Sequence, residues 1–264
     1  MQQKNLYFLL LCVSLLINQG CTMVNVKISE KRNPIPQEIT LGEDVTLKTW
    51  GAIQVNKSHF FPSSFQLKID GVVIYIDPVG VEKAEQADYI LITHDHPDHF
   101  SLKDIKNLLK DETQIICSKG ALKKLKDIQN PIQTTKPGEQ IHYEDFSIEA
   151  TFAYNRKSVF LWIKAHPKSK ENVGYLITTK NGVRIYHAGD TDYVPEIKEL
   201  SDVDVALVPI GGDNLTMNEE EAAKIVNQIR PKIAIPMHYE IKNHEALSRF
   251  EFLVNNKTKV VNLN

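Results

Sequence analysis

The chain has 264 residues, 42% of them hydrophobic, which is enough to bury a full core in one large domain or two small ones. Its formal net charge is −2, and its 31 Lys and Arg residues are scattered along the chain rather than grouped. A dispersed charge of this kind excludes an extended nucleic-acid-binding surface. No nucleic-acid partner is therefore expected.

The first twenty residues predict a secretory signal peptide. Lys4 supplies a positive start, Leu6 to Ile17 form an apolar run too short to span a bilayer, and Gly20-Cys21 follow at once. A small residue directly before Cys resembles a bacterial lipoprotein signal. In that case Cys21 becomes a lipid anchor that touches the membrane, with the protein in the cell envelope facing the periplasm or the exterior. Asn18 departs from that pattern and leaves an ordinary cleaved signal or an uncleaved anchor as alternatives.

Residues 21–42 are polar, contain Pro34 and Pro36, and predict a linker between the membrane and a domain that spans residues 43–264. Two of the three cysteines, Cys12 and Cys21, precede that domain, so no disulfide framework is expected. Cys117 ends an apolar run and is expected to be a buried packing residue.

The first half of the domain predicts strands followed by a strand-to-helix loop. Residues 45–50 and 65–69 alternate between apolar and polar, and Asp70-Gly71 predicts a tight hairpin into a strand over 72–76. Residues 88–93 predict a buried strand, and Ser101 is expected to cap a helix that begins at Leu102. The stretch from Ser58 to Ser64 fits no pattern and is expected to be a loop.

Between this strand and this helix lies Thr93-His94-Asp95-His96-Pro97-Asp98-His99. His94 and His96 are two positions apart at the end of an extended run, so their side chains should point the same way. Asp98 and His99 begin the turn and can face a second point nearby. Imidazole and carboxylate groups suit zinc, or less selectively iron or manganese. The stretch predicts half of a two-metal site, and the alternative is a His-rich surface loop that binds metal loosely or not at all.

The second half repeats this arrangement at two more predicted strand ends. A strand over 114–117, a helix over 121–126 and an alternating run over 146–152 lead to a hairpin across Asn181-Gly182, which delivers Gly189-Asp190. A buried strand over 204–209 and a helix that starts at Asn218 precede the strand 233–235, which runs into His238. A helix over 244–254 and a strand over 260–263 complete the expected order.

The motifs His94-x-His96-x-Asp98-His99, Gly189-Asp190-Thr191 and Pro236-Met237-His238-Tyr239 resemble, in this order and separation, those of the metallo-β-lactamase-fold hydrolases. The resemblance covers about residues 45–255 and looks closest to the branch of ascorbate-6-phosphate lactonase-like proteins and bacterial Zn-dependent hydrolases. Tyr75-Ile76-Asp77-Pro78 and Pro209-Ile210-Gly211-Gly212 also belong to it. It implies an α/β fold, a four-layer αββα sandwich with metals at one edge of the sheets.

The resemblance also implies roles for these residues. His94 and His96 would bind a first metal, Asp98, His99 and His238 a second, and Asp190 would bridge them. About two Zn²⁺ ions per chain are expected, with Mn²⁺ or Fe as alternatives. Such a pair can lower the pKa of a bridging water toward ~7, giving a hydroxide that attacks an ester, lactone, amide or phosphodiester bond of a small-molecule substrate. Asp98 is the candidate catalytic residue, as a metal ligand first and a base second.

One position departs from the family pattern. Relatives carry a third His for the first metal near residue 155, where this chain has Asn155. His166 is the predicted replacement, because it follows the apolar run 159–163, which predicts a strand, and precedes Asp190 in the chain. The alternative is that His166 is a surface residue and that Asn155 binds or hydrogen-bonds a water-filled position.

Two other functions compete with hydrolysis. A di-iron oxidoreductase on the same fold is disfavoured because such proteins typically carry Glu where this chain has His96. A non-catalytic, metal-binding lipoprotein module is favoured by the missing third His and disfavoured by the otherwise complete set of ligands. Substrate identity depends on loops such as 58–64 and 156–172, whose shape no local rule predicts.

Overall fold

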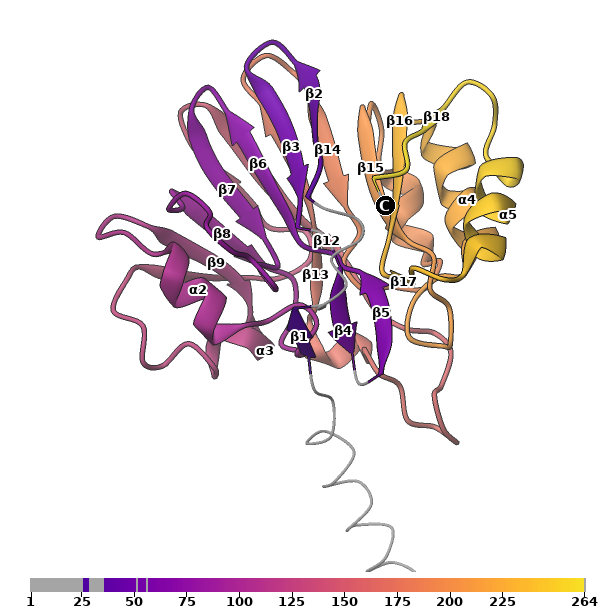
Figure 1. The fold of residues 1–264 in the computed structure, drawn as a ribbon, viewed down its shortest axis with the longest axis horizontal. Helices are drawn as coiled ribbons and strands as arrows, with labels where there is room; N and C mark the ends of the chain where they lie inside the picture. The colour runs from indigo at the N-terminus through magenta and orange to yellow at the C-terminus, as the bar shows by residue number, and fades with distance from the viewer. Residues whose placement is uncertain (1–25, 29–35, 51, 56, 264) are drawn as a thin grey trace, which may run out of the picture.

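The computed structural model describes residues 26–28, 36–50, 52–55 and 57–263 (Figure 1). The predicted signal peptide, residues 1–20, and the predicted lipidation site Cys21 lie outside the described residues. No helix within the described part of the chain is long and apolar enough to cross a membrane.

Two sheets, each of seven strands within the described residues, form the inner layers of the fold (Figure 1). The first has the order β10 (Ile132–Thr135), β9 (Gln114–Ser118), β8 (Tyr89–Ile92), β7 (Val72–Ile76), β6 (Phe65–Ile69), β3 (Val45–Thr49) and β2 (Glu38–Gly42). The second has the order β11 (Gln140–His142), β12 (Phe146–Phe152), β13 (Val173–Thr179), β14 (Arg184–His187), β15 (Val205–Pro209), β16 (Ile233–Met237) and β18 (Lys259–Val260).

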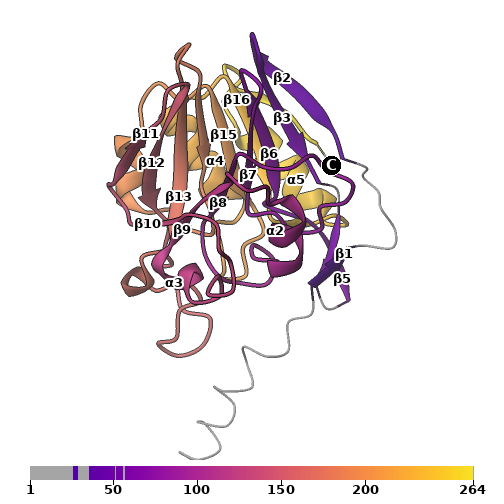
Figure 2. The ribbon, with the colours of Figure 1, turned by 90° about the vertical axis from the view of Figure 1, so that its left-hand side faces the viewer.

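Helices cover the outer face of each sheet (Figures 1 and 2). The elements outside the sheets are α2 (Leu102–Leu108), α3 (Lys119–Leu122), α4 (Glu219–Ile229), α5 (His244–Leu253) and the short 3-10 helices η1 (Lys168–Lys170) and η2 (Pro195–Glu199). Helix α2 packs Ile105 and Leu108 against the first sheet, and α4 packs Ile225 and Val226 against the second. The expected four-layer αββα sandwich is therefore confirmed.

The main core lies between the two sheets because strands of both present apolar side chains to each other. Strand β3 alternates strictly, with Val45 and Leu47 buried. Strand β15 is buried along its whole length, as expected of a strand covered on both faces. A second apolar cluster, which includes Cys117, fills the space between the first sheet and α2 and α3. The prediction that Cys117 is a buried packing residue is confirmed.

The local signals for turns and helix starts hold in the structure. Asp70 and Gly71 both have positive φ in the turn between β6 and β7, as a two-residue hairpin requires. The Asn181-Gly182 turn joins the antiparallel strands β13 and β14. The side chain of Ser101 accepts a hydrogen bond from Asp104 N at the start of α2, and Asn218 forms a full capping box with α4.

The structure corrects the predicted linker at residues 21–42. Strand β2 lies inside that range and pairs with β3, and its Ile39 and Leu41 pack against the main core. Strand β1 (Val26–Ile28) also lies in that range and belongs to a four-stranded sheet with β4 (Ile53–Val55), β5 (Ser58–Phe61) and β17 (Tyr239–Glu240). Strand β2 is an edge strand with one open side, and its residues alternate between polar and apolar. The polar stretch with Pro34 and Pro36 before it gives the range as a whole the composition of a tether.

Four other elements differ from expectation. The helix expected over 121–126 begins earlier and ends at Leu122, and the last strand covers Lys259–Val260 rather than 260–263. Residues 58–61 form a strand rather than a loop. The strand expected over 159–163 is wrong: this run is an exposed turn closed by one isolated bridge between Phe160 and Ile163. An apolar run is buried only if another segment of the folded chain covers it.

Gly174 in β13 allows the strands to meet close to the end of β14. A Cβ atom there would lie 2.6 Å from His187 O, 2.6 Å from Thr151 Oγ1 and 2.7 Å from Ala188 O. We expect Gly174→Ala to lower the free energy of unfolding by about 2–3 kcal/mol, because two of these atoms are backbone and cannot move freely. Thermal unfolding monitored by circular dichroism measures this. Gly120→Ala is the control, since its nearest atom would be 3.8 Å away.

Candidate metal centre

Three strand ends and one loop deliver the chemically active side chains to one place. Strand β8 ends just before Thr93 and His94, β14 ends just before Gly189 and Asp190, and β16 ends just before His238. The backbone of Val173, at the start of β13, donates to Thr93 O at 3.2 Å and joins the two sheets at this point. The fourth contribution, His166, comes from the loop between β12 and β13.

All seven metal ligands expected from the sequence come together. Their ligand atoms form two groups, within each of which the atoms lie within 4.8 Å of one another. The first group is His94, His96, His166 and Asp190, and the second is Asp98, His99, Asp190 and His238. Because Asp190 belongs to both groups, the arrangement has the form of two adjacent sites that share one carboxylate.

Asp190 lies at the centre of this arrangement. Its Oδ2 is 3.3 Å from His238 Nε2, 3.5 Å from His166 Nε2 and 3.8 Å from His94 Nε2, and its Oδ1 is 3.1 Å from His99 Nε2. Gly189 beside it has φ +61°, and a Cβ there would lie 2.8 Å from Val173 O. Glycine is therefore required for the backbone to bring Asp190 into the centre.

The polar atoms that face the centre fit divalent metal ions. His94 Nε2 is buried and has no hydrogen-bond partner among the described residues, and His99 Nε2 and Asp190 Oδ1, although 3.1 Å apart, are not aligned for a hydrogen bond with each other or with another described atom. Buried polar atoms normally find partners, and the exceptions require an explanation such as an ion. Imidazole nitrogen and carboxylate oxygen are the donors that zinc takes in proteins. The donor set and its orphaned atoms therefore match the expected cation.

His96 and His166 meet inside the first ligand group. His96 Nδ1 and His166 Nε2 lie 3.0 Å apart. Because His166 Nδ1 faces two acceptor oxygens, it carries the proton of the neutral ring, so its Nε2 offers a lone pair that can accept an N–H from His96 or bind a metal ion. Both atoms also belong to the first ligand group.

Asp77 orients two of the histidines from behind the site. Its Oδ2 accepts from Thr93 Oγ1 at 2.5 Å and lies 2.7 Å from His99 Nδ1. Thr93 Oγ1 in turn lies 3.0 Å from His94 Nδ1. With Nδ1–H donated to these oxygens, both rings turn Nε2 toward the centre, where it can bind a metal ion once any proton on it has left. Asp77 thus fixes the ring orientation without facing the centre itself.

Asn155 orients the ring of His166 as Asp77 orients the ring of His99. Its Oδ1 accepts the backbone N–H of His166 at 2.9 Å and lies 2.8 Å from His166 Nδ1. Its Nδ2 donates to Asp192 Oδ1 at 3.1 Å and to Leu215 O at 2.9 Å. The structure therefore places His166, not Asn155, against the first group, with Asn155 one layer behind it.

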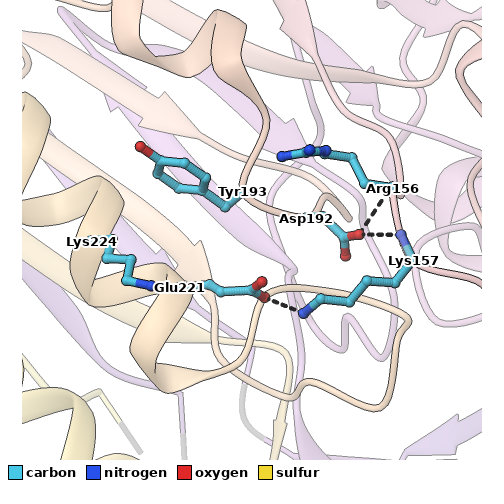
Figure 3. Close-up of a pocket in the computed structure, with 6 residues that line it drawn as sticks. All are labelled: Arg156, Lys157, Asp192, Tyr193, Glu221 and Lys224. Atoms are coloured by element: carbon cyan, nitrogen blue, oxygen red, sulfur yellow. Dashed lines mark hydrogen bonds and ion pairs between the residues drawn. The ribbon is translucent and has the colours of Figure 1, made fainter.

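Asp192 completes this support at the edge of a surface pocket of about 330 Å³ (Figure 3). Its Oδ2 accepts the backbone N–H groups of Arg156 at 2.7 Å and Lys157 at 2.8 Å. Lys157 Nζ in turn lies 2.7 Å from Glu221 Oε2. These contacts fix the chain just after Asn155, and the backbone N–H of Asp192 donates to Tyr154 O at 3.0 Å just before it. Asn155, and with it His166, is therefore held from both sides.

The electrostatics of the two groups differ. Burial lowers the pKa of His94 and of His96, and it lowers the pKa of His166 to about 4. Burial acts in the same direction on His99 and His238, but Asp190 and Asp98 outweigh it. They hold the pKa of His99 well above its usual value and raise that of His238 to about 10.

The two carboxylates show the converse effect. Although burial raises the pKa of a carboxyl group, His99 and His238 lower the pKa of Asp98 to about 2. The same two imidazoles, His238 first, hold the pKa of Asp190 well below its usual value. Both carboxylates are thus ionised at neutral pH, as metal ligands must be.

These directions predict that the second group releases ions first on acidification. Without metal, His99 and His238 carry protons at neutral pH, and an incoming ion must displace them, whereas the imidazoles of the first group are already neutral. As the pH is lowered, protons compete more strongly with metal ions for the imidazoles. The ion affinity of the second group therefore begins to fall at a higher pH than that of the first group. Calorimetric zinc titrations in buffers of different ionisation enthalpy should show roughly two protons released by the second group. Equal proton release by both ions would contradict this.

The centre is closed on one side and open on the other. His94, His99, His166 and Asp190 are buried, while His96, Asp98 and His238 are partly exposed. A small molecule can therefore approach from the side of Asp98 and His238. Asp98 Oδ2 lies 3.2 Å from His238 Nε2 and 3.9 Å from His99 Nε2, so it faces the second group rather than solvent alone.

Sequence reasoning missed the supporting roles of Asp77, Asn155 and Asp192. Asp77 stands at the end of β7, and this strand-end position was the available signal, as it was for the ligands. Asn155 was considered only as a competitor of His166. Nothing local shows that Asp192 turns back toward residues 155–157, because that contact depends on two loops far apart in the chain.

Comparison with known proteins agrees with this geometry. The family model described as the β-lactamase superfamily domain matches residues 58–238. A UPF0173 protein of Pyrococcus abyssi is 38% identical over 179 residues, which cover 66% of this chain and 79% of the relative. A UPF0173 metal-dependent hydrolase of Staphylococcus carnosus is 30% identical over 200 residues, 67% of this chain and 82% of the relative.

A solved structure from Parabacteroides distasonis, provisionally assigned as a metal-dependent hydrolase, superposes with a TM-score of 0.67 at 28% identity. The match covers 86% of this chain and 97% of that structure. The family model alone spans more than half of the chain, and it includes every residue of both ligand groups. The chain therefore belongs to the β-lactamase superfamily, among its metallo-β-lactamase-fold hydrolases.

Proposed function

We propose that the protein is a hydrolase that works with two divalent metal ions, preferably zinc, one at each of the two ligand groups. The observation that carries this proposal is the shared Asp190, which stands in both groups and faces four imidazoles. One tetrahedral ion takes four protein ligands at most, whereas this centre offers seven ligand residues. A binuclear centre uses them all.

The residues divide the work as follows. His94, His96 and His166 would hold one ion, Asp98, His99 and His238 the other, and Asp190 both. Such ions lower the pKa of water toward ~7 and polarise a carbonyl or phosphoryl oxygen, which suits hydrolysis of an ester, lactone, amide or phosphodiester. Asp98 is first a ligand, and its low pKa makes it a weak base.

Zinc is favoured over other metals by the donor set. The two groups contain five imidazoles and two carboxylates, and imidazole suits zinc, iron and copper better than magnesium or calcium. Cys117 belongs to the apolar cluster beneath α2 and is not a donor here. Mn²⁺ or Fe on the same ligands is the alternative that metal analysis separates.

The alternative of a non-catalytic binding module loses its main support. That reading was motivated by the missing third His of the first metal, and His166 now stands in the first ligand group with its Nε2 toward Asp190. The partly exposed side at Asp98 and His238 also leaves room for a substrate to approach.

Metal analysis combined with turnover tests the proposal. Protein purified without chelator should contain about two zinc ions per chain and should cleave at least one compound in a panel of phosphodiesters, lactones and aryl esters. Chelation should abolish this turnover and zinc should restore it. A zinc content of one ion per chain or less, unchanged by Asp98→Ala, would contradict a binuclear centre. Two ions with no turnover on any bond type would favour the binding module.

The location is a separate part of the proposal. The arrangement of Lys4, the apolar run 6–17 and Gly20-Cys21 supports a lipid-anchored protein of the cell envelope. We expect the wild type in the membrane fraction and Cys21→Ser in the soluble fraction. Cys12→Ser, which leaves the lipidation position intact, should fractionate like the wild type. A soluble wild-type protein whose first residue is not Cys21 would refute this location.

A further inference from the structure

One exposed apolar segment is left unexplained by the metal centre. Residues 159–163, the apolar loop tip, have exposed fractions of 41%, 65%, 66%, 80% and 38% in the order Val159, Phe160, Leu161, Trp162 and Ile163. They account for five of the eight large hydrophobic side chains that are exposed in the described part of the chain. A contiguous apolar surface of this kind marks an interaction site more often than scattered single residues do.

The apolar loop tip is held in a fixed shape. Ile163 N donates to Phe160 O at 2.8 Å, and Val159 N donates to Ile163 O at 2.8 Å, so its own backbone satisfies several polar groups. Leu161 has φ +48°, a left-handed conformation that costs energy for a leucine. At its base, Asn155 N donates to His166 O at 2.7 Å. A preorganised turn with paired backbone groups can enter an apolar environment at low cost.

The charges in the chain segment that carries the tip are of one sign. From residue 156 to residue 170 the chain carries five basic side chains and no acidic one: Arg156, Lys157, Lys164, Lys168 and Lys170. Lys157 and Lys168 also pair with Glu221 and Glu196. An apolar tip flanked by lysines is complementary to an anionic lipid surface, where basic residues contact head groups and apolar residues reach the acyl chains.

The position of the tip fits the same partner. The loop between β12 and β13, drawn in salmon, extends from the lower end of the molecule in both views, and β1 lies at that same end (Figures 1 and 2). Four residues lie between the predicted lipidation site Cys21 and Val26, the first residue of β1, so five Cα–Cα steps join the two positions. Such a segment reaches at most about 18 Å. An anchor at Cys21 would therefore keep this end of the molecule close to the bilayer.

We propose that the apolar loop tip inserts into an anionic lipid surface, as a membrane contact in addition to the N-terminal anchor. This contact holds the end of the molecule that carries β1 and the metal centre against the bilayer, because the loop joins Asn155 to His166. The proposal rests on the exposed apolar side chains and the basic residues beside them, and it does not depend on which bond the metal centre hydrolyses.

The chain contains its own reporter for this contact. It has two tryptophans: Trp162 is in the tip, and Trp50 is buried and stacks on Tyr75 at 6.2 Å. The full chain is mixed with phosphatidylcholine vesicles, with and without phosphatidylglycerol, and its emission is compared with that of Trp162→Phe. We expect the Trp162 emission to shift to shorter wavelength on anionic vesicles and to lose most of its intensity to lipids with brominated acyl chains. Trp162→Phe should show neither change.

Further variants separate the apolar and electrostatic contributions while keeping Trp162 as the reporter. Leu161→Asn suits the left-handed backbone, so it should fold normally, but it should lower the inserted-to-free ratio at least roughly tenfold. Lys164→Gln and Lys170→Gln should each lower that ratio roughly fivefold, on anionic vesicles alone. Phe252→Ser, at the most exposed hydrophobic residue described, lies on α5 and should have no effect.

Two outcomes would overturn the proposal. One is a Trp162 emission that vesicles leave unchanged and brominated lipids do not quench. The other is a shift that grows with protein concentration in the absence of lipid, because this would identify a second copy of the chain as the partner of the tip.

Discussion

The Asp190→Asn variant is expected to lose at least one of the two metal ions proposed for the centre and to fall in activity by roughly a thousandfold or more. Asp190 lies within 3.3–3.8 Å of three imidazole nitrogens through Oδ2 and 3.1 Å from a fourth through Oδ1. The substitution keeps the shape of the side chain and removes the charge that both ligand groups share. Elemental analysis, with turnover measured on whichever compound of the panel the wild type cleaves, gives both effects.

Asp95→Asn is the matched control for Asp190. Asp95 stands between His94 and His96 in the sequence, yet its carboxylate points to Lys124 at 3.8 Å and belongs to neither ligand group. Because an exposed pair of this kind contributes only about 0–1 kcal/mol, Asp95→Asn should keep both ions and its fold. If Asp190→Asn retained two ions and wild-type turnover, the shared carboxylate would not be the centre of the site.

The second large effect is expected at His166. His166→Ala should lose one ion, because it removes a buried imidazole whose Nε2 lies 3.5 Å from Asp190 Oδ2. Asn155→Ala should retain that ion and bind it about 10–100-fold more weakly, since Asn155 only orients the ring. The loss should be partial because Leu215 O also lies 3.1 Å from His166 Nδ1. Zinc affinity measured by competition with a chromogenic chelator distinguishes the two variants.

His142→Ala provides the control for removing an imidazole. His142 lies exposed in β11 and belongs to neither ligand group, so its loss should leave both the zinc content and the zinc affinity unchanged. A larger loss in Asn155→Ala than in His166→Ala would mean that Asn155, rather than His166, contacts the ion.

The local patterns predicted much of this architecture. Two-residue turn signals predicted the hairpins at Asp70-Gly71 and Asn181-Gly182, and side chains that can cap helices predicted the starts of α2 and α4. These features depend on residues within a few positions of each other, so the sequence contains all the information that they need. Strand β2 escaped notice because its five alternating residues follow a polar stretch with two prolines, and only its pairing with β3 identifies it as part of the sheet.

His166 shows how a correct position can be predicted for an incomplete reason. The residue was expected at the end of a strand over 159–163, whereas that run is an exposed turn. What places His166 is a set of contacts with Asn155, and through Asn155 with Asp192 and Leu215. Chain order and residue type were sufficient to propose it, but the means by which it is held depends on segments up to 60 residues apart in the chain.

The sequence by itself determined the kind of chemistry and the strand ends that carry it, because a His-x-His-x-Asp-His stretch, a Gly-Asp turn and a later His each follow an apolar run. Only the tertiary structure decided how these residues are divided between the two ligand groups. It placed Asp190 in both groups, put Asp77 and Asn155 behind the rings, and left residues 159–163 without cover. The physical reason is that ligand type is a property of single residues, whereas orientation and burial arise when distant strands and loops meet.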